Sequence, residues 1–292
     1  MKSKTYMVIG STGQLGTDMC DELRLAGFDV HGVDYPDIDI GNERSVASVV
    51  DALKPATIIN CAAFTAVDDC ETQRERAFLL NAEGAGYLAA AAGGCEARIV
   101  HISTDYVFDG CKDGFYLETD QTNPQTVYGR SKLEGERLVA AACENHQIFR
   151  IAWLYGIHGK NFVYAIRAAA DKKAAAGEPL RVVADQFGTP TSTREVCRQV
   201  LRAQAISATG VFHATCEGDC SWFDFAGTIV TAAGIPVEVL PCTTEEFPRP
   251  APRPRNSRLE NRRLKEERID CMVDWRSAFD EFLHDEKRNK EQ

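Results

Sequence analysis

The sequence predicts an α/β fold in which a doubly wound parallel sheet is followed by a smaller C-terminal lobe. Short β-branched apolar runs alternate with longer helical segments over the first half of the chain, as in repeated βαβ units. A glycine-rich turn follows the first apolar run. Beyond about residue 155 the alternation becomes looser, which indicates a second and smaller unit.

Six apolar runs are the expected strands. They are residues 6–9, 28–33, 57–59, 98–102, 148–153 and 181–183. Leu15, Met19 and Leu23 recur at i, i+4 and i+8 between the first two runs. This spacing puts one apolar stripe of a helix on the sheet.

The looser half contains two expected helices, near Asn161 to Ala176 and near Trp222 to Ala233. Residues 247–259 contain four prolines, which exclude a long helix or a central strand and predict an ordered loop. Residues 284–292 are almost wholly charged, so we expect a fraying tail.

The spacing G-x-x-G-x-x-G, formed by Gly10, Gly13 and Gly16, follows the first strand and opens the first helix. Glycines at such a turn allow a close approach to a pyrophosphate, and the helix N-terminus supplies a positive dipole. A glycine-rich turn without a ligand is the alternative. The residues expected to contact a dinucleotide here are Gly10, Thr12, Gly13, Gln14, Leu15 and Gly16.

Asp34 ends the second expected strand, where a carboxylate can accept hydrogen bonds from the adenosine ribose and would repel a 2'-phosphate. This favours NADH over NADPH, although a nearby arginine could admit NADPH and a solvated loop acid is the bland alternative. Asp39 and Ile40 are either adenine contacts or part of a helix-capping approach. Ala62 and Ala63 end the third strand and are small enough to lie against a cofactor.

Tyr128 and Lys132 are four residues apart, so on a helix both side chains leave the same face. A tyrosine with a pKa of about 10 needs a neighbouring cation to work at neutral pH, and the lysine ammonium and a nicotinamide ring would lower that pKa. Thr104 ends the fourth strand at the carboxyl edge of the sheet, where its hydroxyl could hold a substrate carbonyl. Gly135 keeps the helix thin on the Tyr128 face.

These residues carry a resemblance to the extended short-chain dehydrogenase/reductase family and, within it, to the dTDP-4-dehydrorhamnose reductases. The similar segments are GSTGQLG (10–16), CAAFTAVDDCE (61–71), NAEGAGYLA (81–89), STDYVFDG (103–110), YGRSKLEGE (128–136), RIAWLYG (150–156), DQFGTPT (185–191) and RPRNSRL (253–259). Phe64 departs from the tyrosine common in that family, and the last segment carries an additional arginine.

The resemblance implies hydride transfer from NADH or NADPH to the C4 keto carbon of a dTDP-sugar, giving dTDP-L-rhamnose. Tyr128 would donate the proton, Lys132 would bind the nicotinamide ribose and tune Tyr128, and Thr104 would hold the carbonyl. Further contacts are implied with the cofactor for Ala62, Ala63 and Thr65, and with the sugar nucleotide for Asp105 and Trp153. Trp153 has a bland alternative as a core aromatic residue.

The expected division of the chain follows from these motifs. Residues 1–156 form a dinucleotide-binding domain, to which residues 178–215 return. Residues 157–177 and 216–283 form mainly the substrate-binding lobe, and residues 284–292 are the charged tail.

Composition excludes several other classes. Lys and Arg total 33 against 43 Asp and Glu, and a net charge of -10 argues against nucleic-acid binding. No run approaches the roughly 18 apolar residues of a membrane helix, so we expect no membrane contact and a cytoplasmic protein. The eleven cysteines are irregularly spaced, which indicates reduced thiols. We expect no metal site, and the pair Cys216 and Cys220 is no exception.

Two rival functions share the scaffold. A nucleotide-sugar dehydratase or epimerase would place a second carboxylate after Asp105, but Tyr106 stands there. A non-catalytic binding subunit, like the regulatory subunit of methionine adenosyltransferase, is the other rival, and the presence of Thr104, Tyr128 and Lys132 argues against it. The sequence leaves the oligomeric state open, a homodimer included.

Overall fold

The computed structural model describes residues 5–291, and its centre is a six-stranded parallel sheet. The strand order is β10-β5-β4-β3-β1-β2, and every neighbouring pair is parallel. The strands are β1 (Thr5–Ile9), β2 (Asp29–Val33), β3 (Thr57–Asn60), β4 (Arg98–Thr104), β5 (His146–Ile151) and β10 (Gly210–His213). The α/β Rossmann-type fold class is thus confirmed, with the order reversing between β1 and β3.

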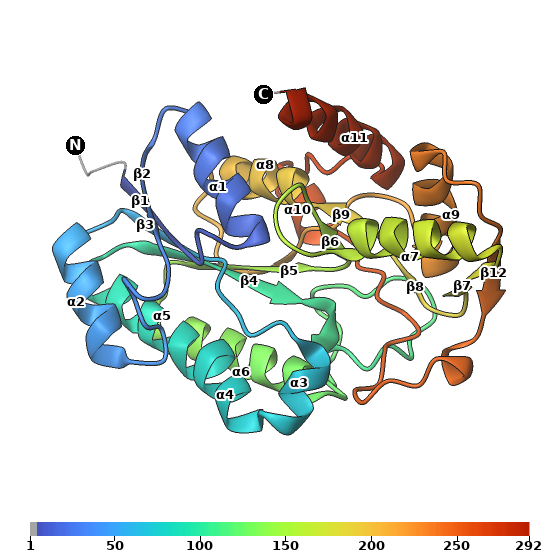
Figure 1. Cartoon of the computed structure of the whole chain (residues 1–292). Helices are drawn as coiled ribbons and strands as arrows, with labels where there is room; N and C mark the ends of the chain where they lie inside the picture. The colour runs from blue at the N-terminus through green and yellow to red at the C-terminus, as the bar shows by residue number, and fades with distance from the viewer. Residues whose placement is uncertain (1–4, 292) are drawn as a thin grey trace.

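Helices cover both faces of this sheet (Figure 1). One face carries α1 (Gln14–Leu25) and α8 (Thr193–Ala203), and the other carries α2 (Glu43–Leu53), α5 (Gly84–Gly94) and α6 (Val127–Ala142). Leu15, Met19 and Leu23 are all buried, which confirms the predicted stripe of α1. The connections contain α3 (Val67–Thr72), α4 (Arg74–Phe78), a π-helical turn (Leu79–Glu83) and a 3-10 turn (Asp105–Val107).

A second hydrophobic core, at the right of Figure 1, is rich in aromatic rings and is called the aromatic core below. It lies among α7 (Phe162–Ala176), α9 (Trp222–Ala233) and α11 (Trp275–Glu291), beside the parallel pair β7 (Leu180–Val183) and β12 (Val239–Cys242). Short strand pairs connect the two cores: β6 (Leu154–Tyr155) with β9 (Thr191–Ser192), and β8 (Phe187–Gly188) with β11 (Cys220–Ser221). Both helices expected in the looser half are confirmed. The prolines lie in a loop that follows a 3-10 turn (Thr244–Glu246).

The segments that pack in each of the two cores differ from the predicted domain ranges at two places. Leu180 and Val182 of β7 pack in the aromatic core, whereas α8 and β10 pack on the central sheet. The chain therefore returns to the sheet at α8 rather than at residue 178. Leu264, in α10 (Arg262–Glu266), packs with the sheet although it lies in the segment expected to form the lobe.

The prediction of a frayed C-terminal tail is wrong, because α11 continues to Glu291. Its last turns are held by ion pairs that no local pattern could reveal. Arg167 Nη1 lies 2.7 Å from Glu286 Oε1, and Arg194 pairs with Asp285. Only Gln292 of the expected tail lies outside the described residues.

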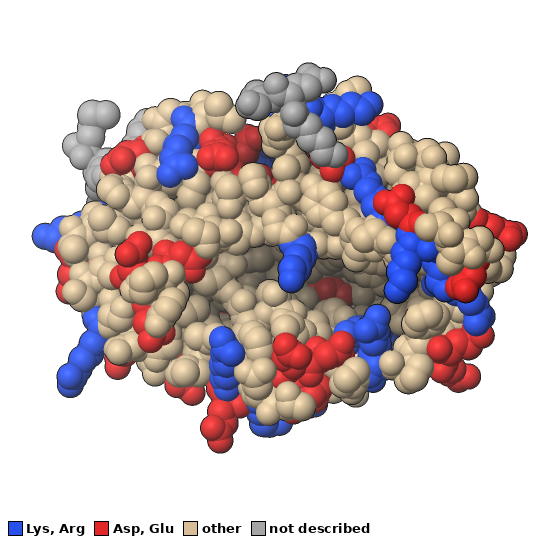
Figure 2. Space-filling model, in the orientation of Figure 1, with Lys and Arg blue, Asp and Glu red and all other residues tan. Residues whose placement is uncertain are grey.

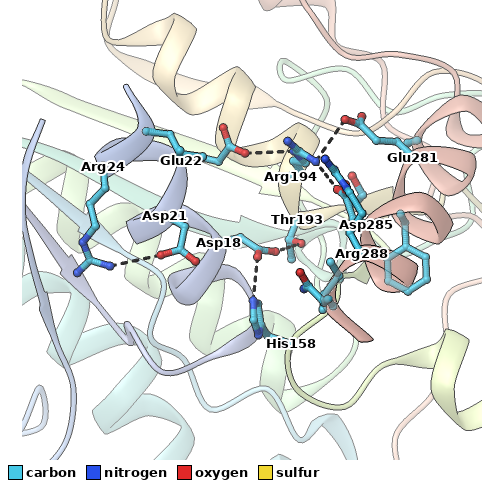
Figure 3. Close-up of a pocket in the computed structure, with 17 residues that line it drawn as sticks. Asp18, Asp21, Glu22, Arg24, His158, Thr193, Arg194, Glu281, Asp285 and Arg288 are labelled. Carbon is cyan, nitrogen blue, oxygen red and sulfur yellow. Dashed lines mark hydrogen bonds and ion pairs between the residues drawn. The ribbon is translucent and has the colours of Figure 1, made fainter. Parts of the chain in front are cut away.

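A hollow of about 730 Å³ between α1, α8 and α11 shows how this helix is tied down (Figure 3). Arg194 on α8 reaches both Asp285 on α11 and Glu22 on α1, the latter at 3.1 Å. Asp18 on α1 accepts a hydrogen bond from the Thr193 hydroxyl and lies 3.4 Å from His158 Nε2. Because the acids of this hollow pair with cations of neighbouring elements, they join the lobe's last helix to the sheet.

Replacing Phe279 with alanine tests whether α11 belongs to the core. Phe279 is buried, with ring centroids 5.5 Å from Phe225 and 5.9 Å from Phe282. We expect Phe279→Ala to lower the free energy of unfolding by about 3–5 kcal/mol in urea titrations. Leu25→Ala, at an exposed position, should change it by less than about 0.5 kcal/mol. A loss below about 1 kcal/mol for Phe279→Ala would contradict the packing described above.

Candidate active site

The glycine turn between β1 and α1 lies directly against the end of β3. Gly10 has a φ of +74°, and a Cβ there would lie 2.8 Å from the Ala62 backbone nitrogen. A Cβ on Gly16 would lie 2.0 Å from the Gly10 carbonyl oxygen. Side chains at these positions would force β1, β3 and α1 apart. No side chain caps the N-terminus of α1, so its first N–H groups remain available to an anion.

A cleft of about 540 Å³ lies over the carboxyl edge of the sheet beside this turn. Figure 2 shows the molecule hollowed on this face, with basic side chains at the rim of the hollow. The cleft brings together most of the predicted site residues, namely Gly10, Thr12, Gly13, Gln14, Leu15, Asp34, Ala62, Ala63, Thr65, Thr104, Asp105, Tyr128, Lys132 and Trp153. Gly16 supports the turn from behind without lining the cleft.

Asp34 lies at the rim of the cleft, fixed to the glycine turn. Its Oδ2 accepts hydrogen bonds from the Thr12 amide at 3.2 Å and the Thr12 hydroxyl at 2.5 Å. Asp39 and Ile40 lie outside the lining. Asp39 Oδ1 accepts a hydrogen bond from the Gly41 amide at 3.0 Å, and Ile40 packs in the core below α2. Their predicted contact with the cofactor has no counterpart in the cleft.

Helix α6 carries Tyr128 and Lys132 on its buried face. The helix begins at Thr126, whose hydroxyl accepts a hydrogen bond from the Gly129 amide at 3.0 Å. Tyr128 and Lys132 follow one turn apart, and both line the cleft. The predicted convergence of a phenol and an amine is therefore confirmed.

Two glycines let α6 approach its neighbours. A Cβ on Gly129 would lie 2.1 Å from the Tyr106 carbonyl oxygen, and one on Gly135 would lie 2.2 Å from the Asn81 carbonyl oxygen. The role expected for Gly135 is thus confirmed. Asn81 also donates to the Ser131 hydroxyl at 3.0 Å, which joins the π-helical turn to α6.

Burial governs the ionisation of Tyr128. It raises the pKa of the phenol above its usual value, and the nearby Thr104 hydroxyl acts in the opposite direction. In the cofactor-free chain, removal of the phenolate from water outweighs the interactions that lower this pKa. Tyr128 accordingly remains protonated at neutral pH, as a proton donor must. The lowering expected from Lys132 together with a bound nicotinamide ring stays a prediction.

Lys132 is also buried, with its Nζ 2.6 Å from the Ile102 carbonyl oxygen and 3.3 Å from His101 Nε2. Burial lowers the pKa of Lys132 to about 8, while Glu136 and Cys61 act in the opposite direction. The pKa of Lys132 thus lies much closer to neutral pH than that of an exposed lysine.

Asp105 joins this cleft to a second cavity. The Thr104 hydroxyl donates to Asp105 Oδ1 at 2.9 Å, and Oδ2 is buried without a hydrogen-bond partner among the described residues. Burial raises the pKa of this carboxyl group to about 6. An unpartnered carboxylate oxygen between two cavities can receive a hydroxyl group of a ligand.

The second cavity, of about 510 Å³, shares Asp105, Tyr106 and Trp153 with the cleft. Trp153 is stacked on Trp222 of α9, with ring centroids 3.4 Å apart. Trp153 therefore lines both cavities instead of filling the core. The remaining lining includes side chains that the sequence analysis did not select, among them Phe162, Arg181, Trp222, Phe247, Arg249 and Arg253.

These residues were missed because no local motif marks them. Trp222, Arg249 and Arg253 come from two separate segments of the lobe, and only the tertiary fold brings them to Trp153. Arg253 lies in the segment RPRNSRL, and the family resemblance of that segment was the only indication in the sequence that this residue lies near the site. Lys160, at the mouth of the cleft, has no sequence signal at all.

The fold and the cleft together define a protein of the extended short-chain dehydrogenase/reductase class. Residues 4–288 match the family model described as the RmlD substrate binding domain, and the chain belongs to this family. A curated relative is the spore coat polysaccharide biosynthesis protein SpsK of Bacillus subtilis, 38% identical over 279 residues, which are 96% of each chain.

Two similar solved structures agree with this assignment. The dTDP-4-dehydrorhamnose reductase of Clostridium acetobutylicum is 44% identical, with a TM-score of 0.93 over 96% of this chain and 98% of that one. The enzyme of the same name from Bacillus anthracis, in complex with NADP, is 35% identical, with a TM-score of 0.92 over 97% and 99%. The resemblance to dTDP-4-dehydrorhamnose reductases is thus confirmed.

Within residues 5–291, no group of three or more His, Cys, Asp or Glu side chains is arranged to hold a metal ion. No helix of that range has the length and apolarity needed to cross a membrane.

The low pKa of Lys132 predicts a pH-dependent stability. Between pH 10.5 and about 8 the unfolded chain binds a proton that the folded chain does not, so destabilisation grows as the pH falls through this window and is constant below it. Lys132→Met should therefore raise the free energy of unfolding by about 2–3 kcal/mol more at pH 7 than at pH 10.

Urea unfolding at the two pH values measures this difference. Lys172→Met is the matched control, because Lys172 lies exposed on α7 and should give the same small change at both pH values. Equal effects of Lys132→Met at pH 7 and pH 10 would show that the folded chain does not depress this pKa.

Proposed function

We propose that this protein reduces the C4 keto group of dTDP-4-dehydro-6-deoxy-L-mannose to give dTDP-L-rhamnose, with NADH or NADPH as reductant. The observation that carries the proposal is the meeting of Tyr128, Lys132 and Thr104 in one cleft beside a glycine turn. The solved relatives named dTDP-4-dehydrorhamnose reductase support the substrate. The eleven free cysteines suit the reducing cytoplasm in which we place the enzyme.

The residues of the cleft fit a nicotinamide dinucleotide. The uncapped N-terminus of α1 suits a pyrophosphate. Because Gly10 lies in close contact with Ala62, a dinucleotide bound there would meet backbone at Gly10 rather than a side chain. Asp34 would meet the adenosine ribose, and Lys132 the nicotinamide ribose. When bound, the cofactor supplies the hydride.

The side chains around the substrate oxygen would complete the reduction. Tyr128 donates its proton to the C4 oxygen as the carbonyl carbon is reduced, and burial keeps that proton in place until then. Thr104 would hold the same oxygen by turning its hydroxyl away from Asp105. Asp105 Oδ2, which has no hydrogen-bond partner among the described residues, would then accept a sugar hydroxyl.

The dTDP part of the substrate would occupy the second cavity. Stacked Trp153 and Trp222 offer a flat apolar surface. Arg249 offers positive charge for a diphosphate, and Arg181 and Arg253, which pair with Glu246 and Asp68, lie in the same lining. Because this cavity shares Asp105 and Trp153 with the cleft, a nucleotide bound there would place its sugar beside Tyr128.

The rivals named in the sequence analysis predict different chemistry. A 4,6-dehydratase needs an acid and a base near C5 and C6, but Tyr106 occupies the position of the second carboxylate and its edge contacts Tyr128. A non-catalytic binding subunit would show no turnover at all.

The first test follows reduced-nicotinamide absorbance with dTDP-4-dehydro-6-deoxy-L-mannose as substrate. We expect oxidation by the wild-type protein, and a fall of at least about 10²-fold for Tyr128→Phe, since this substitution deletes the proton donor and keeps the ring. Tyr87→Phe, on the surface of α5, removes a hydroxyl that bonds only Glu83 and should leave turnover unchanged. No oxidation by wild type with either cofactor would remove the proposed function.

The second test concerns the cofactor. Asp34→Asn keeps the shape of the side chain and removes the charge that would repel a 2'-phosphate, so kcat/KM with NADPH relative to NADH should rise about tenfold. Asp37→Asn removes an exposed charge from the same loop and should leave the ratio within about twofold. An unchanged ratio in Asp34→Asn would show that Asp34 does not face the ribose.

A further inference from the structure

Two buried polar residues lie below the active-site lysine and have no assigned role. Asn60 ends β3, and His101 is its direct neighbour on β4. Both are almost completely buried. Hydrogen bonds connect them to each other and to Lys132 Nζ, so the three side chains form one chain of contacts.

The direction of these hydrogen bonds is set by the backbone. The Ala62 amide can only donate, and it donates to Asn60 Oδ1 at 3.1 Å. The Asn60 amide nitrogen therefore faces His101 Nδ1, at 3.1 Å, and it too can only donate. His101 Nδ1 must then accept. Burial holds the pKa of His101 well below its usual range, and any positive charge on Lys132 lowers it further, so the ring is neutral in either case and carries its hydrogen on Nε2.

This assignment determines what Lys132 can satisfy. His101 Nε2–H points at Nζ, 3.3 Å away, while Nζ donates to the Ile102 carbonyl oxygen at 2.6 Å. An ammonium group has three donors and no acceptor, so it would set hydrogen against hydrogen at the His101 contact. An uncharged amine has a lone pair that accepts from Nε2–H. Each of the contacts from Ala62 to Ile102 then pairs one donor with one acceptor.

We propose that Asn60 and His101 are positioning residues of the active-site lysine, which present an N–H group to Lys132 Nζ and so favour its uncharged form in the cofactor-free enzyme. The inference rests on the proposed function only for the task that it gives to Lys132. A weakened positive charge on Lys132 favours the protonated form of Tyr128, which is the form that a proton donor needs.

Other ionisable groups near Lys132 do not reverse this assignment. Glu136, one turn further along α6, favours the ammonium form, but Arg150 on β5 binds it at 2.6 and 2.8 Å and Ser103 on β4 donates to it at 2.5 Å. Cys61, after β3, is buried as a thiol because burial raises its pKa. Tyr128 is a neutral phenol, as argued above.

The location of the hydrogen on His101 tests the proposal directly. Long-range ¹⁵N–¹H correlation spectra of the labelled, cofactor-free protein distinguish the two neutral tautomers, and His101→Phe identifies the signal among six histidines. We expect hydrogen on Nε2. Hydrogen on Nδ1, or a charged ring at pH 7, would overturn the inference.

Titration of the Lys132 ¹³Cε signal, assigned with Lys132→Met, tests the consequence. Asn60→Asp turns the donor facing His101 Nδ1 into an acceptor, which moves the hydrogen to Nδ1 and leaves a lone pair facing Nζ. The midpoint for Lys132 should rise by about one pH unit or more. Asn145→Asp, an exposed position before β5, adds the same charge and should move it by less than about 0.3 units.

His101→Phe separates hydrogen-bond direction from charge. If His101 presents an N–H donor to Nζ, its loss should raise the titration midpoint of Lys132. If His101 presents an acceptor, its loss would lower that midpoint, and if its role is merely structural the midpoint would not move. Either of the last two results would refute the inference, and the tautomer spectrum stands if this variant does not fold. These measurements use the cofactor-free protein and need no turnover. A failure of the proposed function would therefore leave them unaffected, and their failure would leave the proposed function unaffected.

Discussion

The close approach of α6 to the carboxyl edge of the sheet is the constraint on which the site depends. Gly129 and Gly135 permit it, since a Cβ at either position would meet backbone oxygen near 2 Å. The approach removes Tyr128 and Lys132 from water, which raises the pKa of the phenol and lowers that of the amine. Burial thus drives both groups toward their uncharged forms. Without cofactor, the site thus holds a protonated phenol beside a lysine whose hold on its proton is weakened.

The lobe contributes a different part of the chemistry. Its aromatic core supports Trp222 against Trp153, and its loops bring arginines to a cavity that opens beside Asp105. Arg194 of α8 pairs with Asp285 of α11 and with Glu22 of α1, which fixes this lobe to the sheet (Figure 3). Under the proposed function, the sheet would position the reacting groups, while the lobe would determine which nucleotide sugar reaches them. In this way one scaffold can serve reductases of different sugars.

Local patterns predicted most of the sheet side of the site and little of the lobe side. The glycine turn and the Tyr128–Lys132 pair are encoded within a few residues, so spacing alone located them. Trp222 and Arg249 reach Trp153 only through tertiary packing, which spacing cannot show. The helical end of α11 was missed for the same reason, because the ion-pair partner of Asp285 is Arg194 on α8. The upward shift of the Tyr128 pKa in the cofactor-free chain could not be predicted, since charge is visible in sequence and burial is not.

A crystal structure with NADP⁺ and dTDP-L-rhamnose bound tests the central claim most directly. The account predicts the nicotinamide ribose within about 3 Å of Lys132 Nζ, and Tyr128 Oη at hydrogen-bond distance from the C4 hydroxyl of the sugar. The dTDP group should lie in the cavity beside Trp153 and Trp222. A nicotinamide ring bound away from the Tyr128 face of α6, or a sugar C4 oxygen that contacts neither Tyr128 nor Thr104, would contradict it.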